Sequence, residues 1–257
     1  MRPPPSDVVS AYGGDPTQLV RLAGGRGTSW RCGDLVFKPA DLTDAELAWM
    51  DTALRPRVVD ATIRVSLPLR ARSGRRQVAG WIALPYLRGH HPQGRWHEIA
   101  AVGRAFSRLT SGLDRPSFLD RRDDPWARAD RFAWGELDIP DVPSLVAALL
   151  RLRRPVIDAP TLVHGDLTEN VLLDPQEPPA VLDLSLYWRP PSFATAVVAV
   201  DAVCFHASAT DLLEQLDPAR EFAQYVLRAL LFRIGTDLVT GGSDLRPYTP
   251  VVRWLGR

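Results

Sequence analysis

Three polar residues in the middle of the chain have the types and the spacing that phosphoryl transfer requires. Asp166 follows a short apolar run that ends at His164, Asn170 comes four positions later, and Asp183 ends the next apolar run. In this chemistry the protein holds a metal ion, a nucleotide and a hydroxyl group in line and does little covalent work. One carboxylate orients the attacking hydroxyl, while an amide and a second carboxylate bind Mg²⁺. We therefore predict that Asp166 is catalytic and that Asn170 and Asp183 bind the metal.

The segment 162–186 contains H-G-D-L-T-E-N and then V-L-D-L, which resemble the catalytic and metal motifs of the aminoglycoside phosphotransferase and choline kinase family. The resemblance extends upstream to the glycine-rich residues 24–29 and to L-V-F-K at 35–38. It implies an α+β, bilobal, protein-kinase-like fold, with a small N-terminal lobe made of an antiparallel sheet and one helix. The larger C-terminal lobe would be mainly helical.

The same resemblance implies a function. ATP or GTP and Mg²⁺ would be the cofactors, and the partners would be the nucleotide and a small-molecule hydroxyl acceptor. That acceptor could be a sugar, an amino sugar, an aminoglycoside or an amino alcohol. The implied activity is transfer of the γ-phosphate to an alcohol group.

Lys38 is the only lysine in 257 residues, among 31 basic residues. Lysine and arginine are not interchangeable where a compact charge must sit between phosphate oxygens. Chance is an alternative, because some position must hold the last lysine. Its place at the end of an apolar run after a glycine-rich turn favours contact with the nucleotide phosphates. A Walker A loop is excluded, since it needs Gly before the lysine and this chain has Phe37.

Two further groups of nucleotide-binding candidates come with alternatives. Gly25, Gly27 and Ser29 could cover the phosphates with backbone N–H groups, although a plain hairpin loop explains the glycines equally well. Glu46 is our candidate for the acid that pairs with Lys38. It also lies three positions after Thr43, which is the spacing of a capping box that serves only the helix itself.

The segment around Pro85 and Leu87 resembles the connection between the two lobes, where adenine meets main-chain groups. We therefore predict an N-terminal nucleotide-binding lobe at residues 1–88 and a C-terminal catalytic and acceptor-binding lobe at residues 89–257. In the resemblance, His164 supports the catalytic loop by hydrogen bonds. Asp201, in an otherwise apolar helix, braces the same loop, although an exposed acid would fit the sequence too.

The hydrophobic pattern predicts the elements that position these residues. Strands are expected at 18–22, 29–32 and 35–38, and residues 63–71 and 77–87 should form a hairpin. Helices are expected at 6–12, 42–54, 96–112, 121–136, 144–153 and 192–208, with a last helix that starts at Asp217-Pro218 and closes near Gly241. In the family, the region 121–136 helps to form the acceptor site. An amphipathic helix with its aromatic residues packed inward is the alternative.

Composition narrows the class of protein. The chain is 46% hydrophobic, with 31 basic and 30 acidic residues, so a packed core is expected and nucleic-acid binding is not. No apolar run is long enough to cross a bilayer, and the start has no signal-peptide core. Two distant cysteines suit reduced thiols in a cytoplasmic enzyme. His90, His91 and His97 lack a fourth ligand for zinc. The sequence leaves the oligomeric state open.

The chain departs from the kinase pattern in one spacing. Three residues separate Asp166 from Asn170, where kinases have four. The tighter loop could move the Asn170 amide away from the metal. The rival hypothesis is therefore a catalytically idle, kinase-like protein that binds a nucleotide or a partner.

Overall fold

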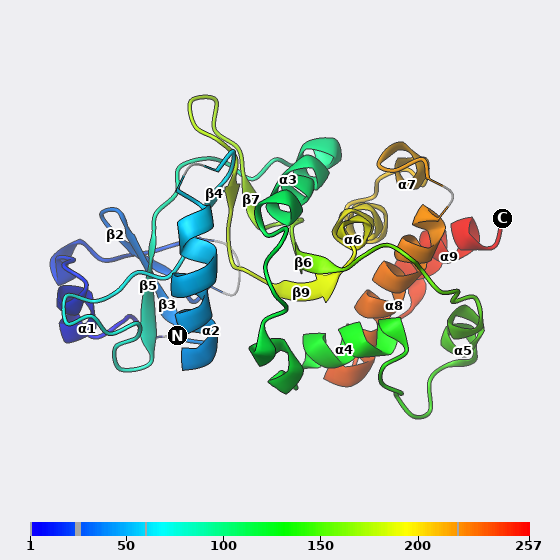
Figure 1. Ribbon diagram of the computed structural model, residues 1–257, viewed down its shortest axis with the longest axis horizontal. Coiled ribbons are helices and arrows are strands. Elements are labelled where there is room, and N and C mark those ends of the chain that lie inside the picture. Colours follow the sequence, from blue (N-terminus) through cyan, green and yellow to red (C-terminus); the bar gives the residue numbers. More distant parts are fainter. Residues whose placement is uncertain (1, 24–26, 60, 220) are drawn as a thin grey trace. The chain divides into compact units, whose positions relative to one another are not determined.

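The computed structural model describes residues 2–23, 27–59, 61–219 and 221–257, which divide into two compact units. The first unit comprises Met1–His90 and Leu172–Asp183, and the second comprises His91–Val171 and Leu184–Arg257 (Figure 1). The chain first passes from one unit to the other after His90, two residues beyond the predicted boundary at residue 88. Residues 172–183 return to the first unit, so Asp183 belongs with Lys38 while Asp166 belongs to the second unit.

The first unit is built on a four-stranded antiparallel sheet in the order β1-β2-β3-β5. Its strands are β1 (Val20–Arg21), β2 (Trp30–Cys32), β3 (Leu35–Pro39) and β5 (Trp81–Pro85). The three predicted strands are present, and β3 lies between two partners, with Lys38 opposite Ile82. One face of the sheet packs Phe37 and Ala83 against Val8 and Val9 of α1 (Ser6–Ala11). A central, packed strand gives Lys38 a rigid base.

A helix follows β3, as the sequence predicts, but it changes its winding midway. Helix α2 (Asp44–Trp49) continues into a π-helical turn, η2 (Met50–Leu54), and a short 3₁₀ turn, η3 (Arg55–Arg57). The π turn carries Asp51, which three arginine side chains contact: Arg55, Arg70 and Arg76.

The predicted hairpin of residues 63–71 with 77–87 is wrong. Strand β4 (Arg64–Val65) pairs in parallel with β8 (Ala180–Val181), in a three-stranded sheet of order β4-β8-β7 with β7 at Val171–Leu172. The first run contains Pro68, which has no N–H to donate to a ladder. The two segments are joined at Leu69, whose N–H donates a hydrogen bond to the carbonyl of Ala83 at 2.7 Å. The parallel pairing joins residues 116 positions apart, which a local pattern does not predict.

The second unit is mainly helical, as the sequence predicts. Its helices are α3 (Trp96–Leu109), η4 (Ser117–Arg121), α4 (Pro125–Trp134), α5 (Ser144–Arg151), α6 (Pro191–Phe205), α7 (Leu212–Gln215), α8 (Phe222–Thr240), η5 (Arg246–Tyr248) and α9 (Thr249–Leu255) (Figure 1). The remaining short 3₁₀ helix, η1 (Pro16–Gln18), belongs to the first unit. Helix α8 begins at Phe222, later than predicted, and the Asp217 carboxylate accepts a hydrogen bond from the N–H of Ala219 ahead of it.

Three helices and one antiparallel pair of strands position the candidate catalytic segment. Helix α6 is buried on all sides and packs against α3 and α8, which explains its nearly continuous apolar sequence. Strands β6 (Thr161–His164) and β9 (Leu186–Arg189) pair antiparallel, with His164 opposite Leu186. The ends of these strands therefore bring residues 165–166 and 184–185 together. No helix among the described residues is long and apolar enough to span a bilayer.

Candidate functional site

The first unit brings Lys38 and Asp183 into direct contact. The Lys38 ammonium forms an ion pair with the Asp183 carboxylate, and it lies 3.6 Å from Asp41. Its side chain is 14% exposed, whereas that of Asp183 is 62% exposed. The one lysine of the chain thus meets the acid of the second motif across 145 sequence positions. Such a pair offers a cation and a carboxylate to the same ligand.

Asp183 has a backbone conformation that few residues adopt. Its φ angle is +40°, in the left-handed region. Aspartate and asparagine tolerate this region better than most residues other than glycine. Unusual backbone of this kind concentrates at functional sites, so the angle supports a functional role for this residue.

Glu46 forms the local contacts of a capping box. Its carboxylate accepts hydrogen bonds from the Thr43 N–H at 2.7 Å and the Thr43 hydroxyl at 2.8 Å, and the Glu46 N–H donates to that hydroxyl at 3.2 Å. Of the two alternatives for Glu46, the capping box is the one whose contacts are formed. The described ion pairs of Lys38 go to Asp41 and Asp183 instead.

The other predicted nucleotide-binding residues that the structure describes lie around the same sheet. Gly25 lies outside the described residues. Gly27 has a φ of +63° and its carbonyl accepts from the Arg21 guanidinium at 2.8 and 3.1 Å. The Ser29 carbonyl accepts a hydrogen bond from the Leu22 N–H at 3.0 Å, which extends the pairing of β1 with β2 by one residue. Pro85 ends β5, and Leu87 follows two residues later.

In the second unit, His164 and Asn170 hold the backbone on either side of Asp166. The Asp166 N–H donates to His164 Nδ1 at 3.1 Å. A longer approach, 3.4 Å, joins the Ser185 N–H to Nε2 of the same ring. The Asn170 amide nitrogen donates to the Asp166 carbonyl at 2.7 Å and lies 3.4 Å from Asp166 Oδ2. Hydrogen bonds within the short loop therefore fix both the N–H and the carbonyl of Asp166.

Asp201 lies beneath this loop. It is 3% exposed, and its carboxylate accepts from the Thr168 hydroxyl at 2.8 Å. It also accepts from Nε of Arg233 at 2.7 Å. Arg233 reaches Asp166 as well, with 2.8 Å between Nη2 and Oδ1. These contacts are those that a bracing role for Asp201 requires. Sequence reasoning missed Arg233, because one arginine among many in an apolar helix carries no motif.

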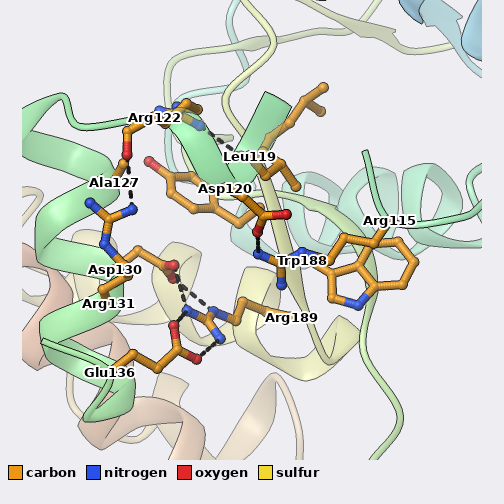
Figure 2. Close-up of a pocket in the computed structure, with 12 residues that line it drawn as sticks. Arg115, Leu119, Asp120, Arg122, Ala127, Asp130, Arg131, Glu136, Trp188 and Arg189 are labelled. Carbon is orange, nitrogen blue, oxygen red and sulfur yellow. Dashed lines mark hydrogen bonds and ion pairs between the residues drawn. The ribbon is translucent and has the colours of Figure 1, made fainter. Parts of the chain in front are cut away.

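A polar cavity of about 240 Å³ opens in the second unit, between α4 and β9 (Figure 2). At its base Arg189 is buried and binds two carboxylates, Asp130 at 2.6 and 3.0 Å and Glu136 at 2.6 and 2.8 Å. Burial opposes the charge on Arg189, but the bonds from Glu136 and Asp130 outweigh it, so its pKa lies above the ordinary value. Burial raises the pKa of Asp130 despite that same guanidinium.

Tyr187 links the cavity to the candidate catalytic loop. This side chain lines the cavity, and its ring would lie 2.5 Å from a Cβ placed on Gly165, the residue before Asp166. Burial raises the pKa of Tyr187 to about 12, so the phenol stays protonated at neutral pH. The predicted acceptor region, residues 121–136, thus contributes a wall to a cavity that Tyr187 also lines.

The donor atoms suit Mg²⁺ better than a transition metal. Among the described residues, no three His, Cys, Asp or Glu side chains gather in a way that could hold a metal ion. Mg²⁺, however, takes one or two protein oxygen ligands and completes its shell with phosphate and water. The exposed Asp183 carboxylate and the amide oxygen of Asn170 are ligands of that kind.

No known family profile and no curated protein matches the chain in sequence. Solved structures do match its fold. A microcompartment-associated aminopropanol kinase is 14% identical, with 98% of this chain and 93% of that chain covered and a TM-score of 0.62. An AMP-bound spectinomycin phosphotransferase is 12% identical (97% and 96% covered, TM-score 0.59). A choline/ethanolamine kinase family protein from Mesorhizobium loti is 18% identical (96% and 89% covered, TM-score 0.56). The α+β, protein-kinase-like fold that the motifs imply is therefore confirmed.

Proposed function

We propose that this chain is an ATP- and Mg²⁺-dependent phosphotransferase that moves the γ-phosphate of the nucleotide to a hydroxyl group of a small molecule. The observation that carries the proposal is the ion pair between Lys38 and Asp183. In this proposal Lys38 contacts the nucleotide phosphates. Asp183 and Asn170 would hold Mg²⁺, which neutralises charge on the phosphates when bound. Asp166 accepts a hydrogen bond from the acceptor hydroxyl and orients it.

The cavity lined by Tyr187 and the region 121–136 supports a small acceptor that is not a polycation. Its charged lining consists of four arginines and three acids, namely Arg115, Arg122, Arg131, Arg189, Asp120, Asp130 and Glu136. A polycationic aminoglycoside would require an excess of negative charge. The volume of about 240 Å³ is also below the roughly 300–1,000 Å³ of pockets for drug-sized ligands. Within the range of sugars, amino sugars, aminoglycosides and amino alcohols, we therefore favour a compact alcohol or sugar.

The rival proposal is a catalytically idle protein that binds a nucleotide or a partner. It draws support from the short loop, in which the Asn170 amide nitrogen is bound to the Asp166 carbonyl. It also draws support from Asp166 itself, because one of its two carboxylate oxygens is bound to Arg233. The other oxygen, Oδ2, is the atom through which an active enzyme would work.

The experiment combines turnover with binding. Purified protein is supplied with Mg-ATP or Mg-GTP and a panel of sugars, amino sugars, amino alcohols and aminoglycosides, with water as the acceptor in the blank. Calorimetry measures nucleotide affinity with and without Mg²⁺. We expect Asp166→Asn to lower turnover about 10²–10⁴-fold, the range of general acid–base groups, with nucleotide affinity unchanged.

Asp183 offers a matched pair of variants. Asp183→Asn keeps a residue that tolerates the left-handed backbone and removes the charge, whereas Asp183→Ala changes both. We expect both to lose the Mg²⁺-dependent part of nucleotide binding. Binding that does not depend on Mg²⁺ even in the wild type would reject the metal role. Nucleotide binding without turnover on any acceptor would favour the idle alternative.

A further inference from the structure

Arg233 is a buried cation that joins the candidate catalytic residue to the core. It lies in the middle of α8, and its side chain is 13% exposed. Its guanidinium contacts two carboxylates at once. Nε and Nη2 bind Asp201, and the same Nη2 lies 2.8 Å from Oδ1 of Asp166. Arginine is suited to this, because its planar fork carries several donors in fixed directions.

The two ends of this cluster differ in exposure. The Asp201 side chain is 5% exposed and takes two bonds from Arg233 as well as one from the Thr168 hydroxyl. The Asp166 side chain is 49% exposed and takes one bond from Arg233, through Oδ1. Burial opposes the charge on Arg233, but the two carboxylates outweigh it, so its pKa lies above the ordinary value. The cation is therefore permanent, and Asp201 anchors it.

The rest of the loop controls the backbone of Asp166 but not its carboxylate. Its N–H is bound to His164 and its carbonyl to Asn170. The carboxylate meets the Asn170 amide only at 3.4 Å, from Oδ2. The bond from Arg233 is thus the short contact that fixes the direction of the carboxylate. It leaves Oδ2 as the oxygen directed to an acceptor.

We propose that Arg233 is a positioning residue for the phosphotransfer reaction: it holds Oδ1 of Asp166 so that Oδ2 receives the acceptor hydroxyl. This inference rests on the function proposed above. The competing view is that Arg233 only neutralises Asp201 and stabilises the fold. The two views differ in what they predict for turnover per folded molecule.

The first test is Arg233→Lys, compared with Arg228→Lys. Lysine keeps the charge but cannot reach both carboxylates with a rigid fork. Arg228 is a matched control, because it lies on the same helix, is 5% exposed, and bonds to the carbonyls of Gln224 and Arg154 rather than to the catalytic loop. A misplacement of about 1 Å can cost about 100-fold in rate. We expect kcat for ATP turnover to fall by about that factor in Arg233→Lys, with the Kd for Mg-ADP unchanged. Arg228→Lys should lower Tm but leave kcat within about threefold.

A second variant guards against simple unfolding. Arg233→Gln combined with Asp201→Asn replaces the buried ion pair with a neutral, hydrogen-bonding pair, a change that folded proteins often tolerate. It removes the cation from Asp166, so we expect a folded protein with kcat lowered at least tenfold and an unchanged Kd for Mg-ADP. Wild-type kcat in this folded double variant would overturn the proposal.

The third test asks whether Arg233 acts through Asp166. In an Asp166→Asn background, Arg233→Lys should cause no further loss of turnover, because the group that it positions is already gone. Two additive losses would overturn the proposal. Failure of the wild type to turn over ATP with any acceptor or with water would reject the proposed function and this inference together. An active wild type with unaffected Arg233 variants would reject this inference alone.

Discussion

Gly165 lies where the catalytic loop has no room for a side chain. A Cβ at this position would lie 2.5 Å from two ring carbons of Tyr187. Gly165 is not among the residues with positive φ, so alanine fits its backbone and only the ring stands in the way. The ring is fixed as well, since Tyr187 is 3% exposed and packs edge-on against Phe232 at 5.4 Å.

We therefore expect Gly165→Ala to destabilise the protein. Overpacking of a dense core costs about 1–3 kcal/mol, and an immobile ring puts this site at the upper end. Alanine also reduces the entropy of the unfolded chain, which returns about 0.4–1 kcal/mol. The net loss is about 2 kcal/mol. At about 2–4 °C per kcal/mol for a chain of this size, Tm should fall by about 4–8 °C.

The assay is thermal unfolding followed by circular dichroism, with Gly256→Ala as the control. Gly256 has a φ of −90° at the end of α9, and its nearest Cβ neighbour would be 3.7 Å away, which is ordinary contact. Its Tm should stay the same or rise slightly. In a Tyr187→Leu background the ring is gone, so Gly165→Ala should cost less than in the wild type. An unchanged Tm for Gly165→Ala, or full additivity with Tyr187→Leu, would refute the steric argument.

Three more predictions concern charged groups. Asp130→Asn should lower stability by about 1.5–3 kcal/mol in a urea titration, the range for hydrogen bonds to charged groups, although Glu136 still pairs with Arg189. Glu46→Gln keeps the capping box and should preserve both Tm and nucleotide affinity, while Glu46→Ala should lower the free energy of unfolding by about 0.3–1 kcal/mol. Loss of nucleotide affinity in Glu46→Gln would instead favour Glu46 as the partner of Lys38. Burial opposes the charge on Asp51, but bonds from arginines outweigh it, so its pKa lies below the ordinary value of a carboxyl group. Its contribution to stability is therefore present above that ordinary pKa and is lost as the pH falls through the lowered pKa, and Asp51→Asn should flatten the acid limb of a Tm–pH curve.

Local patterns predicted the longer helices and strands β1, β2 and β3, because these depend on nearby residues, but they did not predict the short helices α7 and α9. Helix α3 occupies residues 96–109 of the predicted 96–112, since its apolar positions repeat with the helical period. The capping box at Thr43 was readable as one of two alternatives, and the structure forms it. The parallel partner of β4 was not readable, because that pairing joins distant segments and its two residues carry no distinct period.

The candidate site likewise contains some residues that the local sequence identifies and others that only the fold identifies. Lys38 and Asp183 could each be singled out from the sequence because each lies in a motif with a chemical role, but Glu46 was the predicted partner of Lys38 and the structure pairs Lys38 with Asp183. Arg233 could not be singled out in this way, because it is one of many arginines and no motif surrounds it. Its burial becomes evident only from the fold. Its two partners, Asp166 and Asp201, come from different elements, 67 and 32 positions away. Residues that touch a ligand are constrained in type by the ligand's chemistry, so they leave motifs.

Residues that hold such ligand-binding groups in place are constrained only by the space and charge around them. A buried acid such as Asp201, at 3% exposed, must find a donor, and the apolar sequence around it on α6 supplies none. The sequence therefore indicates that a cation or several donors must reach Asp201 from elsewhere, without saying which. An arginine in an apolar stretch of another helix is the complementary signal. Matching unpaired buried charges between apolar helices would have made Arg233 a candidate, with Arg228 as the competing choice on the same helix.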